Sequence, residues 1–131
     1  MNKKELNTFR RKVWYKYKIP GMSNLHRVKK NALFLHVPKG KDIGYEHEKK
    51  KFDVCFALKK AKMEFITEAQ SCKDGRIIDV VCLDTGTEIE VVDSSLTDIT
   101  KEAIEKGDIP IMVLYLDDAF DVDDMIRRVF A

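Results

Sequence analysis

The most regular pattern of hydrophobic and polar positions lies in the middle of the chain. Two runs rich in β-branched residues, 77–83 and 88–92, flank the segment 84–87, whose sequence Asp-Thr-Gly-Thr is typical of a tight turn. This pattern predicts a β-hairpin. Residues 64–69 precede it as a third strand, and residues 109–116 form a nearly continuous apolar run, which is typical of a strand covered on both faces.

Helical periodicity surrounds these strands. A long helix is predicted from residue 44 to about residue 61, and the spacing of Glu48, Phe52, Cys55 and Phe56 predicts that these four share its core-facing stripe. An acid on a core-facing stripe is unusual and indicates a role in a site. The alternative is that an acid in the first turns of a helix complements the helix dipole. Further helices are predicted over four segments: 4–18, 23–32, 96–104 and 125–130.

The ends of the helix over 96–104 are also predicted. Ser94 or Ser95 can cap its start, and Gly107 can end it. Because a strand, a helix and a buried strand follow one another here, we expect a crossover that brings strand 109–116 parallel to strand 88–92.

The order helix, three strands, helix and strand predicts an α/β core over residues 44–131, with a mixed sheet covered by helices. Residues 1–43 would add a basic helical arm, all within one compact domain. A chain of 131 residues with 44% hydrophobic residues can bury such a core. No apolar run approaches the roughly 20 residues of a membrane span, so we expect a soluble, cytoplasmic protein without a membrane partner.

Two acids interrupt the apolar pattern of the hairpin. Strict alternation puts Asp79 on one strand face with Val81, and Glu90 on one face with Glu88. A loop of two or four residues would bring Asp79 and Glu90 to the same face of the hairpin, whereas a three-residue loop would separate them. The alternative is that Asp79 faces solvent at a sheet edge.

The sequence Arg-Ile-Ile-Asp at 76–79, a short hairpin and then Ile-Glu-Val-Val-Asp-Ser at 89–94 resemble the core of the PD-(D/E)xK nucleases. This restriction-endonuclease-like superfamily includes archaeal Holliday-junction resolvases. The resemblance covers about residues 44–116, and it implies a restriction-endonuclease-like αβββαβ fold. It also implies a metal-dependent DNA endonuclease that cleaves phosphodiester bonds, with branched or junction DNA as a substrate, and a homodimer.

The resemblance further implies which residues form the site. Asp79 and Glu90 match the acids that hold Mg²⁺ or Mn²⁺ and activate water, assisted by the backbone carbonyl of Val91. Glu48, or failing it Glu46, matches an acid near the start of the core helix that reaches the metal site. Hard carboxylate oxygens are the ligands that these ions prefer. The chain departs from the family at Val92, where the family has a catalytic Lys.

A working nuclease would therefore need another cation. Lys101 is the candidate, and Lys73 and Arg76 are weaker ones; the alternative is that Lys101 is solvated helix surface. A second alignment takes Glu88 and Glu90 as the acid pair, with a Glu at the position of the Lys.

Charge is divided unevenly along the chain. Residues 1–51 contain 15 Lys and Arg against 4 Asp and Glu, whereas residues 52–131 contain 9 against 18. A basic segment with interleaved aromatics suits contacts to DNA, through phosphate neutralisation and stacking. The alternative is that the aromatics form the buried stripe of a helix. The predicted DNA-binding residues are Arg10, Arg11, Lys12, Lys16, Lys18, Arg27, Lys29 and Lys30.

Three functions stay open from the sequence. The first is the metal-dependent nuclease, and the second is a catalytically inactive nuclease-like module that binds nucleic acid or a protein, for which Val92 is the main support. The third is an α/β domain unrelated to nucleases. The register of the hairpin distinguishes the third, because acids gathered at one place favour a nuclease ancestry and scattered acids oppose it.

Overall fold

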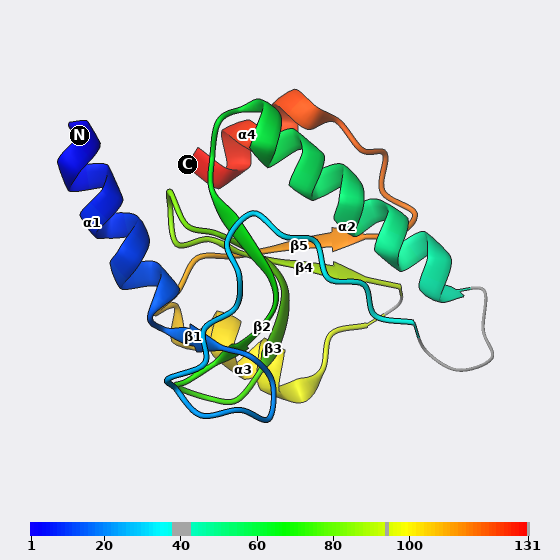
Figure 1. Cartoon of the computed structure of the whole chain (residues 1–131). Helices are drawn as coiled ribbons and strands as arrows, with labels where there is room; N and C mark the ends of the chain where they lie inside the picture. The colour runs from blue at the N-terminus through cyan, green and yellow to red at the C-terminus, as the bar shows by residue number, and fades with distance from the viewer. Residues whose placement is uncertain (38–42, 94, 131) are drawn as a thin grey trace.

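Five strands form one mixed sheet in the order β1-β2-β3-β4-β5 (Figure 1). The computed structural model describes residues 1–37, 43–93 and 95–130. Neighbouring strands pair antiparallel from β1 to β4, and β4 pairs parallel with β5. The α/β class and the parallel last strand are therefore confirmed. The strands are β1 (Tyr17–Lys18), β2 (Phe65–Ser71), β3 (Ile77–Cys82), β4 (Glu88–Val92) and β5 (Ile111–Tyr115).

Helices cover both sides of this sheet. Figure 1 shows α2 and α4 side by side on one face and α3 on the other, where it connects β4 to β5. Among the described residues, no helix is both long enough and apolar enough to cross a membrane. The helices are α1 (Lys3–Trp14), α2 (Ile43–Lys60), α3 (Asp98–Lys106) and α4 (Val122–Phe130).

Each face of the sheet has its own hydrophobic core. On the α2 side, residues such as Leu58, Val80 and Met125 pack together. On the side of α1, Val13 and Tyr17 pack against the sheet. Both layers bury apolar area, which is the main source of stability in a domain of this size.

The N-terminal segment differs from its prediction. Helix α1 ends at Trp14, because Tyr17 and Lys18 pair with β2 as an edge strand, so the predicted helix over 4–18 is too long. Residues 23–32 are not helical, so that prediction is wrong. The Trp14 indole instead donates a hydrogen bond to the Val28 carbonyl at 2.6 Å, which holds an irregular segment against α1.

The start of α3 is also corrected. Thr97 is the cap, since its side-chain oxygen accepts a hydrogen bond from the Thr100 amide, and Ser95 is therefore not the cap. Ser94 lies outside the described residues. Gly107 ends the helix as predicted, and its φ of 68° is the left-handed conformation that glycine adopts most easily.

Helix α2 presents a different face to the core than predicted. Glu48 and Cys55 are buried, but Phe52 and Phe56 are 50% and 60% exposed, so their prediction as core residues is wrong. The residues that face the sheet include Lys51, Val54 and Leu58, spaced i, i+3 and i+7. Two stripes along this helix have helical spacing, one through Phe52 and Phe56 and one through Lys51 and Leu58. The stripe through Lys51 and Leu58 packs on the sheet.

Candidate functional site

The β3–β4 hairpin brings its two acids to the same level of the sheet. Its loop has four residues, 83–86, closed by a hydrogen bond from the Cys82 amide to the Thr87 carbonyl at 2.9 Å. Val80 stands opposite Ile89 in the ladder, and continuing this register puts Asp79 opposite Glu90. A four-residue loop is one of the two cases in which the sequence predicts that the acids meet.

At Asp79 and Glu90, hydrogen bonds from backbone amides to side chains replace the backbone-to-backbone hydrogen bonds between β3 and β4. The Asp79 amide donates to Glu90 Oε1 at 3.3 Å, and the Val91 amide donates to Asp79 Oδ2 at 2.8 Å. Strict alternation also breaks here, because Ile78 packs in the core on the α1 side while Val80 packs in the core on the α2 side. Asp79 lies between them, so its side chain reaches α2 instead of sharing a face with Val81.

Strand β2 is also irregular at this level. The β2–β3 register puts Glu68 opposite Asp79, and Glu68 has a positive φ of 48°. A non-glycine residue in this conformation is uncommon and costs on the order of 1 kcal/mol or more. Its carboxylate accepts a hydrogen bond from Lys51 of α2 at 2.7 Å. Both strands therefore direct an acid toward α2 at the same level of the sheet.

Helix α2 supplies the charges that meet these acids. Lys51 Nζ lies 2.6 Å from Glu48 Oε1, and His47 Nδ1 lies 2.5 Å from Glu48 Oε2. His47 Nε2 lies 3.4 Å from Asp79 Oδ2. Five side chains thus form a row of alternating charge, which we call the charge row: Glu68, Lys51, Glu48, His47 and Asp79.

The surroundings change the protonation of this row and of Glu90. The hydrogen bond to Asp79, helped by Glu48 and opposed by burial, raises the pKa of His47 to about 9. Burial, followed by the charge of Asp79, raises the pKa of Glu90 to about 8. Burial also opposes the charge of Glu48, but hydrogen bonds from Lys51, His36 and His47 keep its pKa below the ordinary value. At neutral pH, His47 is therefore a cation and Glu90 holds a proton.

A pocket of about 280 Å³ opens beside His47. Val92, at the position where the resembled nucleases have Lys, lines this pocket together with His47. Lys51 has no exposed side-chain surface, whereas 26% of the His47 side chain is exposed. His47 is therefore the cation of the charge row that a ligand in the pocket can reach. The pocket is lined by His36, Gly44, His47, Val91, Val92, Asp93 and Leu116.

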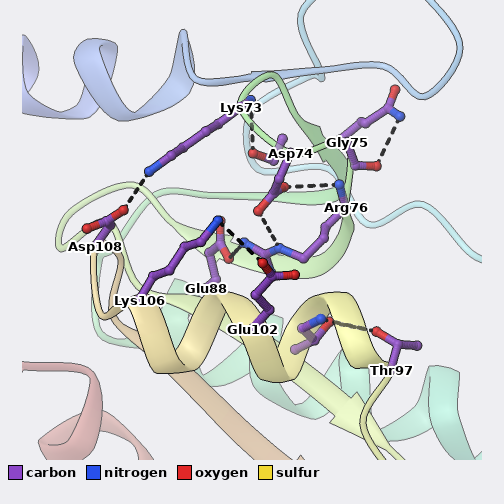
Figure 2. A network of polar contacts seen from close by, with 12 residues as sticks. Lys73, Asp74, Gly75, Arg76, Glu88, Thr97, Glu102, Lys106 and Asp108 are labelled. Atoms are coloured by element: carbon purple, nitrogen blue, oxygen red, sulfur yellow. Dashed lines mark hydrogen bonds and ion pairs between the residues drawn. The ribbon is translucent and has the colours of Figure 1, made fainter.

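The structure does not bring the predicted replacement cations to this cluster. Lys101 is exposed on α3. Lys73 forms an exposed ion pair with Asp108 at 2.7 Å, and Arg76 binds Asp74 at 2.8 Å, both within the network of Figure 2.

Glu88 belongs to that second network rather than to the site. It is fully buried, and its carboxylate accepts hydrogen bonds from the Tyr17 hydroxyl at 2.6 Å and from Arg76 Nη2 at 2.7 Å. Figure 2 shows Glu88 and Arg76 beside α3. The alternative pairing of Glu88 with Glu90 as metal ligands is therefore not supported, because Glu88 already has a cation and a donor.

The predicted DNA-binding residues fall into two groups. Three have partners within the protein: Arg10 binds Asp84 through two hydrogen bonds, Arg27 lies over the Tyr15 ring and Lys30 lies over the Trp14 ring. Phe9 and Trp14 of α1 pack on the sheet, as the alternative interpretation predicts for a helical stripe, whereas Tyr17 is buried as part of strand β1 and Tyr15 is 53% exposed. The other group is exposed, apart from the half-buried Lys18: Arg11, Lys12, Lys16, Lys18 and Lys29.

The donors at Asp79 and Glu90 have the chemistry that a divalent cation requires. The two carboxylates lie at the same level of neighbouring strands, each accepting a backbone amide of the other strand, and among the described residues Glu90 has no ion-pair partner. Burial first, and then the neighbouring charge of Asp79, raises the pKa of Glu90. Glu48 reaches the cluster through His47, and as the described side chains stand, no three His, Cys, Asp or Glu residues are grouped to hold a metal.

His47 and Lys51 were not predicted from the sequence as site residues. The sequence feature that could have identified them is their spacing, since His47, Lys51 and Leu58 follow one helical stripe. Lys51 ends a run of three lysines, 49–51, and such a run is normally read as a solvated face. Charged residues on a helix stripe that also contains Leu58 indicate buried partners.

Comparisons of the chain with protein-family models, with curated proteins and with solved structures find no significant match.

Proposed function

We propose that this protein is a Mg²⁺-dependent nuclease with a restriction-endonuclease-like core, in which Asp79 and Glu90 hold the ion. The observation that carries the proposal is the pairing of these two carboxylates at the level where side chains replace the β3–β4 ladder. The neighbouring charge of Asp79 disfavours ionisation of Glu90, and a bound dication would allow both carboxylates to be ionised. The order of elements from α2 to β5 also agrees with an αβββαβ core.

Each residue of the cluster has a distinct role in this proposal. The carboxylates of Asp79 and Glu90 and the Val91 carbonyl would hold Mg²⁺ or Mn²⁺. A bound ion supplies the charge that lowers the pKa of an attacking water and stabilises negative charge on the scissile phosphate. His47, protonated at neutral pH and open to the pocket, is the cation that replaces the missing Lys at Val92.

Glu48 and Lys51 act as positioning residues. Glu48 binds His47 Nδ1 and so fixes the other ring nitrogen toward Asp79, and Lys51 fixes Glu48. Lys51 is too deeply buried to contact a substrate. The exposed cations of the N-terminal segment, such as Lys12 and Lys16, would contact the phosphate backbone of DNA.

The proposal is tested by a cleavage assay with Mg²⁺ or Mn²⁺ on single-stranded, duplex, flapped and four-way DNA. Asp79→Asn should reduce the cleavage rate by about 10²- to 10³-fold or more, and His47→Gln by about 10²-fold. His26→Gln is the matched control, because His26 is exposed and binds Ser23. An independent readout is the melting temperature, which Mg²⁺ should raise in the wild type and not in Asp79→Asn.

The same assay distinguishes the second function. Val92 instead of Lys favours an inactive nuclease-like module that binds nucleic acid or a protein. Salt-sensitive DNA binding without cleavage of any substrate, and without stabilisation by Mg²⁺ or Mn²⁺, would support that module and refute the nuclease.

A further inference from the structure

Three aromatic rings lie on the outward face of α2. Tyr45, Phe52 and Phe56 are 69%, 50% and 60% exposed, and their spacing of seven and four residues puts them in one line along the helix, which we call the aromatic stripe. The rings of Phe52 and Phe56 lie 6.0 Å apart. A surface helix normally has a polar outer face, so three exposed aromatics in line mark a contact surface.

Lysines accompany these rings. Helical spacing puts Lys49, Lys59 and Lys60 within about 60° of the centre of the aromatic stripe, and all three are exposed. In the described part of the chain, the lysines of α2 that have hydrogen bonds or ion pairs are Lys50 and Lys51, on its buried side. The three exposed lysines, which we call the stripe lysines, are therefore available to a ligand.

A groove of about 400 Å³ continues the basic edge of this surface between α2 and α4. Lys60 and Arg127 contribute two cations to its lining, and Asp123 contributes one acid. Arg127 lies 4.0 Å from Asp124 in an exposed ion pair, and such a pair is weak. The groove thus extends the surface of rings and cations beyond Phe56.

We propose that the outer face of α2 binds single-stranded DNA, with unpaired bases stacked on the aromatic stripe and phosphates beside the stripe lysines. Stacking accepts any base, because every base has a π-face. In a duplex the bases stack on one another and present only their edges, so these rings select an unpaired strand. Residues 45 and 56 are roughly 16 Å apart along the helix, which is room for about three bases.

The composition of this surface favours a DNA strand over a protein partner. Lysine is depleted at protein interfaces, whereas here three lysines are interleaved with three rings. The acids Glu46 and Asp53 lie at about 80° to 100° from the centre of the aromatic stripe, so the stripe lysines are nearer to the rings than the acids are. A strand centred on the rings therefore meets cations first.

The aromatic stripe begins beside the proposed nuclease site. Gly44 and His47 line the pocket of that site, and Tyr45 lies between them in the chain. The choice of DNA as the strand rests on the proposed function, whereas binding itself requires neither a metal nor Asp79. If both proposals hold, a strand stacked on α2 leads to the pocket, and flapped or single-stranded DNA should be cleaved faster than duplex.

The test is the fluorescence anisotropy of a labelled oligothymidine, titrated with the full chain in the presence of a chelator. Phe52→Ala and Phe56→Ala should each raise the dissociation constant about fivefold or more, and binding of a duplex of equal length should not change. Phe130→Ala is the matched control, because Phe130 is 63% exposed at the end of α4 and does not line the groove. Phe52→Trp should retain binding, whereas Phe52→Leu, which keeps an apolar side chain without a ring, should not.

Charge variants test the position of the phosphates. Combined Lys49→Ala and Lys60→Ala should lower the slope of oligothymidine affinity against salt by about 1.4, and Lys106→Ala on α3 should leave it unchanged. Asp53→Asn should tighten binding about twofold, since it removes a negative charge beside the strand, whereas a basic protein partner would bind this variant more weakly.

Several results would overturn the proposal. They are a wild type that does not bind oligothymidine, affinity that is unchanged in Phe52→Ala and Phe56→Ala, and equal weakening by Phe130→Ala. Tighter, stripe-dependent binding of oligouridine would overturn the choice of DNA. Because the chelator removes the metal, stripe-dependent binding without any cleavage in Mg²⁺ would refute the nuclease and leave this inference standing.

Discussion

Replacing Glu90 by Gln should stabilise the protein, and only at neutral to alkaline pH. A pKa of about 8 in the folded protein, against an ordinary value of 4.5, means that ionising Glu90 disfavours the folded state. The upper limit of this effect is about 4 to 5 kcal/mol, since one pKa unit corresponds to about 1.4 kcal/mol. Glu90 is only partly buried, and solvent screening reduces the expected gain to about 1 to 3 kcal/mol.

The pH window follows from the direction of the shift. Below pH 4.5 Glu90 is protonated in both the folded and the unfolded chain, so Gln and Glu should differ little. As pH rises from 4.5 to 8, the unfolded chain loses this proton first and the wild type loses stability, whereas the Gln side chain stays neutral. Gln can still accept the hydrogen bond that the Asp79 amide donates. The difference should therefore reach its maximum above pH 8.

The assay is urea unfolding at pH 5, 7 and 9 in the presence of a chelator, on the wild type, Glu90→Gln and the exposed control Glu105→Gln. His47, with a pKa of about 9, also withdraws stability as pH rises from 6.5 to 9, but it does so in all three proteins. A Glu90→Gln protein that is no more stable than the wild type at pH 9 would refute the crowding of Asp79 and Glu90. It would also remove the main support for a metal there.

Three further changes test other parts of the site. Lys51→Met should destabilise the protein by about 3 to 5 kcal/mol in urea unfolding, because it leaves Glu48 and Glu68 without their buried cation, whereas the exposed Lys49→Met should cost within about 0.5 kcal/mol. Combined Lys12→Ala and Lys16→Ala should lower the slope of DNA affinity against salt by about 2, and Lys101→Ala should leave it unchanged if α3 does not contact DNA. Val92→Lys should restore part of the cleavage lost in His47→Gln; a folded double variant without recovery would show that position 92 does not correspond to the family Lys.

The elements that the sequence predicts well are those set by neighbouring residues. The bounds of β4, 88–92, agree with the predicted strand, and the length of the loop was enough to predict that Asp79 and Glu90 stand at the same level. The break in alternation at Asp79 was not predictable, because it depends on contacts with α2. The N-terminal helix was overestimated because its end depends on a partner far along the chain. Tyr17 pairs with Ser71 of β2, and no local signal in residues 15–18 indicates that pairing.

The orientation of α2 was not predictable for a different reason. Its sequence offers two stripes of helical spacing, one through Phe52 and Phe56 and one through Lys51 and Leu58, and aromatic residues favour the first as the core. The structure buries the second, because Lys51 finds Glu68 on β2 and Lys50 donates to the Tyr115 carbonyl at 2.5 Å. A buried Lys requires partners that only the tertiary structure supplies.

Glu88 and Glu90 show most clearly what local sequence cannot distinguish. They lie two residues apart on β4, yet Glu88 is bound by Arg76 and Tyr17 whereas Glu90 faces Asp79. Their conversion to Gln should therefore have opposite effects. Glu88→Gln leaves the buried Arg76 with Asp74 as its remaining acid, and breaking a buried ion pair typically costs about 3 to 5 kcal/mol. Urea unfolding at pH 9 should find Glu88→Gln less stable and Glu90→Gln more stable than the wild type. Destabilisation by both changes would mean that Glu90 is as structural as Glu88, and that this hairpin holds its acids for folding and not for a metal.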